Sequence, residues 1–189
     1  MRIWFFVFAL GVIMALPLHF LSVEHRKLRA RYGPDKGNRI AETYGRVSGY
    51  LMFFSLIGIW LAPQPRFDFL ILPSSLFLFV PLSSLGAFLL CNSVSGLSRK
   101  VSEAHRPEKV VTTGIYAVVR HPQYLGFLLV HAGFSFLLSA WFALLSTPVL
   151  FLMLFLMARK EETELVQEFG QDYAAYRRKV PMLVPKFGK

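Results

Sequence analysis

Four long stretches of this chain contain no aspartate, glutamate, lysine or arginine. They run over residues 3–23, 47–65, 69–98 and 121–158. A helix that crosses the hydrocarbon core of a bilayer needs about 20 mainly apolar residues. Charged side chains are costly at that depth, so their exclusion from four such stretches is informative. The pattern predicts an all-α integral membrane protein.

Composition supports one membrane domain over residues 1–189. The chain is 54% hydrophobic and 17% charged, whereas soluble domains are about 45–50% apolar and about 25% charged. Its single cysteine excludes an internal disulfide and a multi-cysteine metal site, and we expect no bound metal.

The stretch 121–158 is long enough for one tilted helix or for two helices. Arg120 flanks its first end, and Arg159 and Lys160 flank its second. Basic residues favour the cytoplasmic side of a membrane, so both ends are expected there. That requires two spans joined by a tight turn near residues 139–141. The sequence thus predicts five transmembrane helices, at roughly 3–23, 47–64, 69–91, 124–139 and 141–158.

The basic residues also predict the topology. Seven lie in 24–46, five in 99–120 and seven from residue 159 onward, which makes 19 of the 21 lysines and arginines. We therefore expect the N-terminus outside and the C-terminus in the cytoplasm. The net charge of +10 then reflects topology and attraction to anionic headgroups, not nucleic-acid binding. The segments 99–123 and 159–189 are expected to form a cytoplasmic cap, and 24–46 a basic loop with a turn at Gly33-Pro34-Asp35.

The first candidate motif precedes and begins the fourth predicted span. It reads Gly114-Ile115-Tyr116 and, three residues later, Arg120-His121-Pro122-Gln123-Tyr124-Leu125-Gly126. Proline suits the first turn of a helix, so Pro122 is expected to start this span. Arg120 and His121 would then lie at a helix N-terminus, where an anion is favoured. They could equally be membrane-flanking anchors. Further along, Tyr124, Leu128, His131 and Ser135 share one face, which should point into the bundle.

The second candidate motif follows the last predicted span. Glu161-Glu162 comes directly after the apolar run, and Phe169-Gly170, Tyr173, Tyr176 and Val180-Pro181 follow. Acidic residues are disfavoured at the C-terminal end of a helix. The pair therefore suggests a site, although a solvated helix face is the simpler alternative.

Taken as an ordered set, the two motifs resemble the isoprenylcysteine carboxyl methyltransferase family and the related phospholipid methyltransferases. The resemblance covers roughly residues 108–185, and the first three spans match in hydropathy alone. It implies methyl transfer from S-adenosylmethionine at the cytoplasmic membrane face. The chain carries no Gly-x-Gly-x-x-Gly fingerprint, which agrees with a family that binds this cofactor without a Rossmann domain.

The resemblance implies two sets of site residues. Cofactor-binding positions would be Glu108, Lys109, Val110, Val111, Tyr116, His121, Pro122, Gln123, Tyr124 and Glu161. The catalytic positions would be Arg120 and Arg159, which would hold the acceptor's reactive group, and Glu161. A carboxylate such as Glu161 suits a ribose diol, and aromatic rings suit adenine and the sulfonium.

The resemblance implies an acceptor that is a lipophilic molecule entering from the bilayer, a carboxylate of the isoprenylcysteine kind. Two positions depart from the family pattern: Glu108 stands where histidine is usual, and Met157 where an arginine is usual. Three alternatives stay open. The acceptor could be the amine of phosphatidylethanolamine, the chain could be a sterol-reductase-like NADPH enzyme, or it could be a non-enzymatic membrane scaffold.

Overall fold

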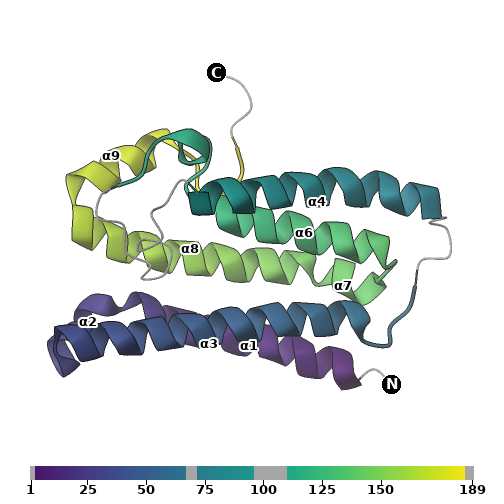
Figure 1. The fold of residues 1–189 in the computed structure, drawn as a ribbon, viewed down its shortest axis with the longest axis horizontal. Helices are drawn as coiled ribbons and strands as arrows, with labels where there is room; N and C mark the ends of the chain where they lie inside the picture. The colour runs from purple at the N-terminus through teal and green to yellow at the C-terminus, as the bar shows by residue number, and fades with distance from the viewer. Residues whose placement is uncertain (1–2, 67–71, 96–109, 186–189) are drawn as a thin grey trace.

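The computed structural model describes residues 3–66, 72–95 and 110–185, and these form a long helical bundle (Figure 1). The helices are α1 (Ile3–Val23), α2 (His25–Tyr32), α3 (Pro34–Leu61), α4 (Leu72–Ser95), the 3₁₀ turn η1 (Gly114–Ala117), α6 (Pro122–Leu137), α7 (Trp141–Leu145), α8 (Thr147–Phe169) and α9 (Gln171–Lys179). Within these ranges there is no β-strand, only an isolated bridge between Arg66 and Ala140. The all-α prediction is confirmed.

The predicted hairpin in 121–158 is confirmed. Helix α6 ends at Leu137, Ser139 adopts a positive φ of 49°, and the chain reverses through α7 into α8. A proline in the first turn of α8 fits the restart of a helix. Helix α8 continues past residue 158, where the predicted span ends, to Phe169, so Glu161 and Glu162 lie on the same continuous helix.

The segment 24–46 is mostly helical, which corrects the prediction of a loop. Only the turn was predicted correctly: Gly33, with φ of 82°, separates α2 from α3, and Pro34 begins α3. Gly37 packs against α2 so closely that a Cβ would meet the Arg29 nitrogen at 2.6 Å. This packing holds α2 and α3 as a helical pair, a tertiary effect that the charge pattern does not reveal.

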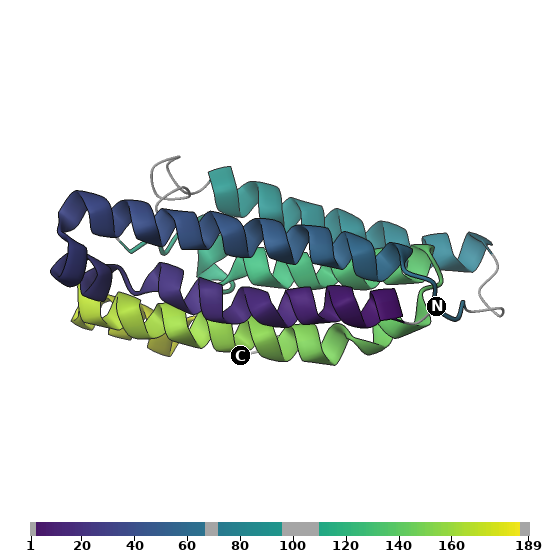
Figure 2. The same cartoon turned by 90° about the horizontal axis from the view of Figure 1, so that it is seen from below.

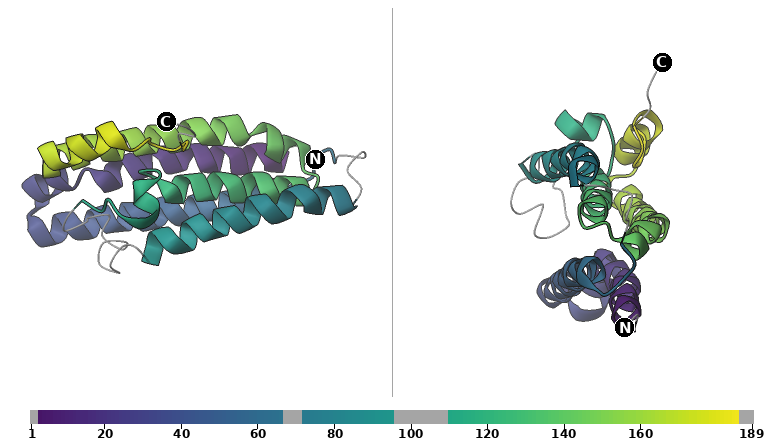
Figure 3. Two further views of the ribbon diagram at one scale, coloured as in Figure 1. Left: turned by 90° about the horizontal axis from the view of Figure 1, so that it is seen from above. Right: turned by 90° about the vertical axis from the view of Figure 1, so that its right-hand side faces the viewer.

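Two layers make up the bundle. Helix α1 lies along α3 on one side and along α8 on the other, while α4 packs on α6 (Figure 2; Figure 3). The α4–α6 crossing depends on glycine, since a Cβ at Gly126 would lie 2.9 Å from the Gly86 carbonyl oxygen. The core between α1, α3 and α8 contains Val12, Leu56, Ile59, Leu150, Met153 and Leu154.

Apolar side chains also cover the outside of the bundle. Phe54, Leu61 and Phe77 expose 62%, 67% and 78% of their surface. In the described residues, two helical segments, Ile3–Val23 and Ser75–Ser95, are long and apolar enough to cross a membrane. Large exposed apolar patches mark contact with lipid or protein. Together these features indicate a membrane protein.

Candidate functional site

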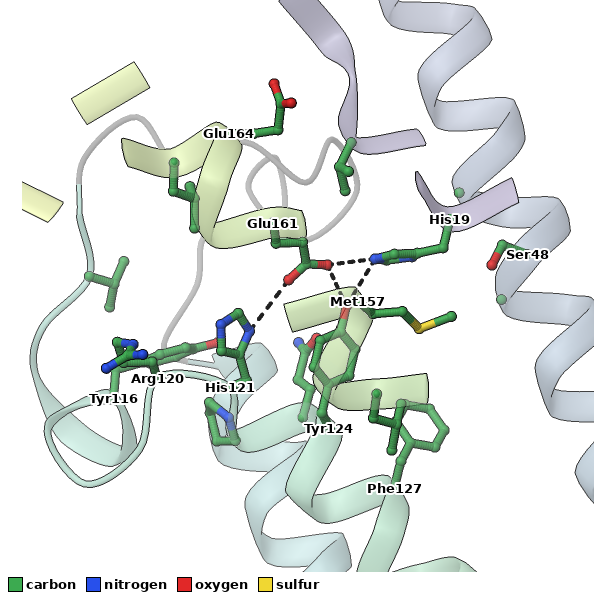
Figure 4. A pocket seen from close by; sticks show the side chains of 18 of the residues that line it. His19, Ser48, Tyr116, Arg120, His121, Tyr124, Phe127, Met157, Glu161 and Glu164 are labelled. Carbon is green, nitrogen blue, oxygen red and sulfur yellow. Dashed lines mark hydrogen bonds and ion pairs between the residues drawn. The ribbon is translucent and has the colours of Figure 1, made fainter. Parts of the chain in front are cut away.

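A cavity of about 320 Å³ lies at the end of the bundle that carries α2, η1 and α9. Its walls come from α1, α2, α3, η1, α6, α8 and α9, and from the segment that precedes η1. Polar and aromatic side chains line one end, around Glu161, His121 and Tyr124 (Figure 4). Apolar side chains line the rest. The cavity therefore offers a polar end and an apolar arm.

The C-terminal segment holds the polar end in place. The backbone N–H groups of Arg120 and His121 donate to the carbonyl oxygens of Pro181 and Met182, at 2.9 and 3.0 Å. The Tyr176 hydroxyl donates to the Tyr116 carbonyl oxygen at 2.6 Å. These bonds attach α9 and the following residues to the start of α6. The described parts of the two predicted cap segments thus contact each other.

Four charged side chains form a chain of alternating charge beside the cavity. Arg120 Nε lies 2.6 Å from Glu162 Oε1, and both side chains are nearly fully buried. His121 bridges the two carboxylates, with Nε2 3.2 Å from Glu162 Oε1 and Nδ1 3.4 Å from Glu161 Oε2. Arg120 Nη1 also donates to the Arg177 and Val180 carbonyl oxygens. Buried charges need such partners, and here each charge has one of opposite sign.

These contacts shift the pKa values of His121, Glu161 and Glu162. Burial by itself would lower the pKa of His121, but its bonds to Glu161 and Glu162 outweigh burial and raise that pKa. Burial would likewise raise the pKa of Glu161, yet the hydrogen bonds with His121 and His19 hold it well below its ordinary value. The pKa of Glu162 is lowered against burial by His121 and Arg120. These pKa shifts all favour the charged forms, an imidazolium between two carboxylates.

The other oxygen of the Glu161 carboxylate, Oε1, contacts His19 and Tyr124, which also contact each other. His19 Nε2, from α1, lies 2.8 Å from Glu161 Oε1 and 3.1 Å from the Tyr124 hydroxyl. The Tyr124 hydroxyl donates to the same Glu161 oxygen. Figure 4 shows His19 between Glu161 and Ser48, where the polar end meets the apolar arm.

The structure brings most of the predicted site residues together. Those that line the cavity are Val110, Val111, Tyr116, Arg120, His121, Pro122, Gln123, Tyr124 and Glu161. Glu108 and Lys109 lie outside the described residues. Arg159 is exposed on α8, with its guanidinium 6.0 Å from the Phe155 ring centroid, and does not line this cavity. Arg120 lines it, but its guanidinium is engaged by Glu162 and two carbonyl oxygens.

The predicted polar stripe on α6 does point inward. His131 and Ser135 are fully buried. His131 Nε2 contacts the Ala143 carbonyl oxygen at 3.0 Å and the Ser146 hydroxyl at 3.3 Å. These partners belong to the α6–α8 connection, so His131 packs the hairpin turn at the far end of the bundle from the cavity.

Sequence reasoning missed the contributions of α1 and α3. His19 is a histidine within an apolar run, and that isolated polarity was the one available signal. From α3, the cavity receives Gly45, Ser48, Gly49, Met52 and Leu56. Their spacing of three or four residues marks one helix face. It does not reveal whether that face packs on a neighbour or lines a cavity.

The polar end suits the cofactor that the resemblance implies. The Glu161 carboxylate can accept hydrogen bonds from a diol, and the parallel rings of His121 and Tyr124, with centroids 5.5 Å apart, offer a flat aromatic surface. Helix α6 begins here at Pro122 without a side-chain cap, so its first-turn N–H groups are available to a carboxylate. The chemistry of these side chains is therefore compatible with S-adenosylmethionine.

The apolar arm runs from this end toward the middle of the bundle. It is lined by Met52, Leu56, Phe127, Leu150, Leu154 and Met157. A second cavity, of about 400 Å³ and almost entirely apolar, lies beyond it between α1, α3, α7 and α8. Leu56 and Leu150 line both cavities and so form the wall between them.

Comparison with known proteins supports the resemblance that the two motifs indicate. Residues 80–172 match the phospholipid methyltransferase family. The chain is 40% identical over 85 residues to a protein-S-isoprenylcysteine O-methyltransferase of Schizosaccharomyces pombe. This match covers 44% of this chain and 36% of that protein. The chain is 42% identical over 74 residues to methanethiol S-methyltransferase 2 of Bradyrhizobium diazoefficiens, which covers 38% of this chain and 27% of that protein.

Each of these matches covers less than half of this chain. A further relative, protein-S-isoprenylcysteine O-methyltransferase B of Arabidopsis thaliana, is 36% identical over 41% of this chain and 40% of its own length. The chain thus matches less than half the length of each of these relatives. No solved structure matches it. The predicted resemblance is confirmed: residues 80–172 match the phospholipid methyltransferase family, and the relatives that the chain matches include isoprenylcysteine and methanethiol methyltransferases.

Proposed function

We propose that this chain is an S-adenosylmethionine-dependent methyltransferase that acts on a membrane-embedded amphiphile. One observation carries the proposal: the predicted cofactor residues that the structure describes line the polar end of a cavity whose other end is apolar. A polar cofactor and a lipophilic acceptor can then meet at the junction. The acceptor that the resemblance favours is an isoprenylcysteine-like carboxylate.

Each part of the polar end has a role in this proposal. Tyr116, His121, Gln123 and Tyr124 would hold the cofactor, with Glu161 at its ribose. When bound, S-adenosylmethionine would supply a methyl group on a positively charged sulfur. The aromatic rings and the Glu161 carboxylate favour such a cation. A carboxylate acceptor is already a nucleophile, so the protein's task is to orient it and exclude water.

The topology that accompanies this proposal puts the cavity on the cytoplasmic side. The support is the distribution of basic residues, which cluster at the cavity end. Arg26, Lys160 and Arg177 belong to the helices at this end, and the seven basic residues of 24–46 lie on α2 and α3 near it. Basic residues favour the cytoplasmic face of a membrane.

Transfer of a labelled methyl group tests the proposal. The purified protein in lipid is given labelled S-adenosylmethionine with either a prenylated cysteine or phosphatidylethanolamine. We expect label in the prenylcysteine methyl ester, and a loss of about tenfold or more in Glu161→Ala, because the charge-assisted contact with the cofactor's ribose is removed. Thr163→Ala is the control, because Thr163 is exposed on α8 and outside the cavity.

Two results would count against the proposal. Label in neither acceptor, or equal transfer by Glu161→Ala and the wild-type protein, would contradict it. Label in the phospholipid alone would favour the second candidate, an amine N-methyltransferase. That candidate draws its support from the family match at residues 80–172.

A further inference from the structure

Helix α3 carries an exposed stripe of side chains along its outer face. Its members follow one another at intervals of three or four residues, which places them on one side of the helix. They are Lys36, Arg39, Thr43, Arg46, Tyr50 and Phe53, and all six are exposed. The acidic residues of this part of α3, Asp35 and Glu42, are not members of the stripe.

The chemistry of the stripe changes once along its length. Its first part is cationic, whereas Tyr50 and Phe53 are aromatic and expose 63% and 52% of their surface. The change falls where the predicted span 47–64 begins. Helix α3 has 28 residues, so it is about 42 Å long, whereas the hydrocarbon core of a bilayer is about 30 Å thick. The cationic turns should therefore lie among the lipid headgroups, and the aromatic turns against the acyl chains.

Two of the cations have no carboxylate partner in the part of the chain that the structure describes. There, no ion pair involves the guanidinium of Arg39 or Arg46. The ammonium of Lys36, in contrast, lies 5.8 Å from the Tyr32 ring centroid. Arg39 and Arg46 are two helical turns apart, about 10 Å along the axis, so their long side chains can converge on one group. Guanidinium groups bind phosphate oxygens in a bidentate manner.

From this pattern we propose that the outer face of α3 binds an anionic phospholipid. Its phosphate lies between Arg39 and Arg46, and its acyl chains lie along Tyr50 and Phe53. A basic segment that only follows the membrane topology would attract anionic lipid no more strongly here than elsewhere at this end of the bundle. The proposal uses no residue that lines the cavity, so it stands independently of methyl transfer.

Native mass spectrometry of the whole chain in a neutral detergent tests the site, because it counts the lipid molecules that stay bound. Phosphatidylglycerol is compared with phosphatidylcholine that has the same acyl chains. We expect the first phosphatidylglycerol to bind about tenfold more tightly or better, since two basic residues act on its charge. The double variant Arg39→Gln/Arg46→Gln should lose this preference. Both positions are exposed, so the variant should fold.

A matched control separates a specific site from general attraction. The double variant Arg177→Gln/Arg178→Gln removes the same charge from exposed positions of α9, at the same end of the bundle (Figure 1). It should keep the preference of the wild type. Equal losses in the two double variants would overturn the site. Equal binding of the two lipids by the wild type, or an undiminished preference in Arg39→Gln/Arg46→Gln, would do the same.

A second measurement tests whether the acyl chains contribute. Glycerol 3-phosphate carries the phosphate without chains, so an excess of it should not displace bound phosphatidylglycerol. Displacement would indicate a site for free phosphate esters and would overturn the assignment to a lipid. These measurements involve neither cofactor nor acceptor, so their failure would leave the proposed methyltransferase function intact.

Discussion

The two halves of the bundle differ in what they give the cavity. The half that carries the family match, from α4 to α8, supplies Arg120, His121, Glu161 and Glu162, which form a continuous chain of charges. The half formed by α1 and α3 supplies His19 and an otherwise mostly apolar wall. The difference suggests a division of labour, with one half binding the cofactor and the other shaping the acceptor's space.

The two halves are joined at the cavity end by polar contacts. Lys160 Nζ of α8 lies 2.8 Å from Glu24 Oε1, and Arg26 donates to Gln167 at 3.1 Å. These residues are partly exposed, and such pairs contribute little to stability. The buried charges within the family half should matter far more, and this contrast can be tested.

The largest expected effect follows from removing Glu162. The change Glu162→Ala leaves the buried charges of Arg120 and His121 without this carboxylate, and should lower the free energy of unfolding by about 3–5 kcal/mol. The matched change Lys27→Ala breaks an ion pair whose lysine side chain is 72% exposed. It should cost less than about 1 kcal/mol. Denaturant unfolding in detergent measures both, and similar losses would contradict the contrast.

The next effect concerns the packing within the family half. In Gly126→Ala, the new Cβ would lie 2.9 Å from the Gly86 carbonyl oxygen, so α4 and α6 must separate. We expect a loss of about 1–3 kcal/mol. Gly49→Ala on α3 meets no atom within 4 Å and should be neutral or stabilising, since alanine favours a helix. Thermal unfolding compares the two, and an equal response would argue against a close α4–α6 crossing.

A smaller effect tests the acceptor side. Leu56 is 5% exposed and lines both cavities, so Leu56→Trp should shorten the apolar path. Losing the burial of about two methylene groups corresponds to about tenfold in affinity. We therefore expect about a tenfold loss of transfer to a long-tailed acceptor and little change with a short one. Acceptors that differ in tail length alone provide the measurement, and an effect independent of tail length would show that the tail lies elsewhere.

The smallest effect is a dependence of stability on pH. The pKa of His121 is raised above 6.5 in the folded protein. Its contribution is therefore fully present below pH 6.5 and is lost as the pH rises through the raised value. The stability difference between wild type and His121→Gln should shrink toward alkaline pH. A difference that grows with pH would mean that His121 is neutral in the folded state.

Sequence reasoning succeeded where chemistry is local. The family resemblance, together with the predicted hairpin, placed His121 and Glu161 in one site, and the basic flanks of 121–158 predicted that hairpin. The helical course of 24–46 was missed because it depends on α2 packing against Gly37. His19 was missed because its partners, Tyr124 and Glu161, are 105 and 142 residues away.

Binding of S-adenosylhomocysteine, followed by isothermal titration, tests the division between the two halves most directly. Wild-type protein and Leu56→Trp should bind it with similar affinity, because Leu56 lies in the apolar arm. His121→Gln should lose binding by about tenfold or more, as expected when a charge-assisted contact is removed. Absence of binding by the wild type, or equal losses in the two variants, would contradict the claim that the family half alone binds the cofactor.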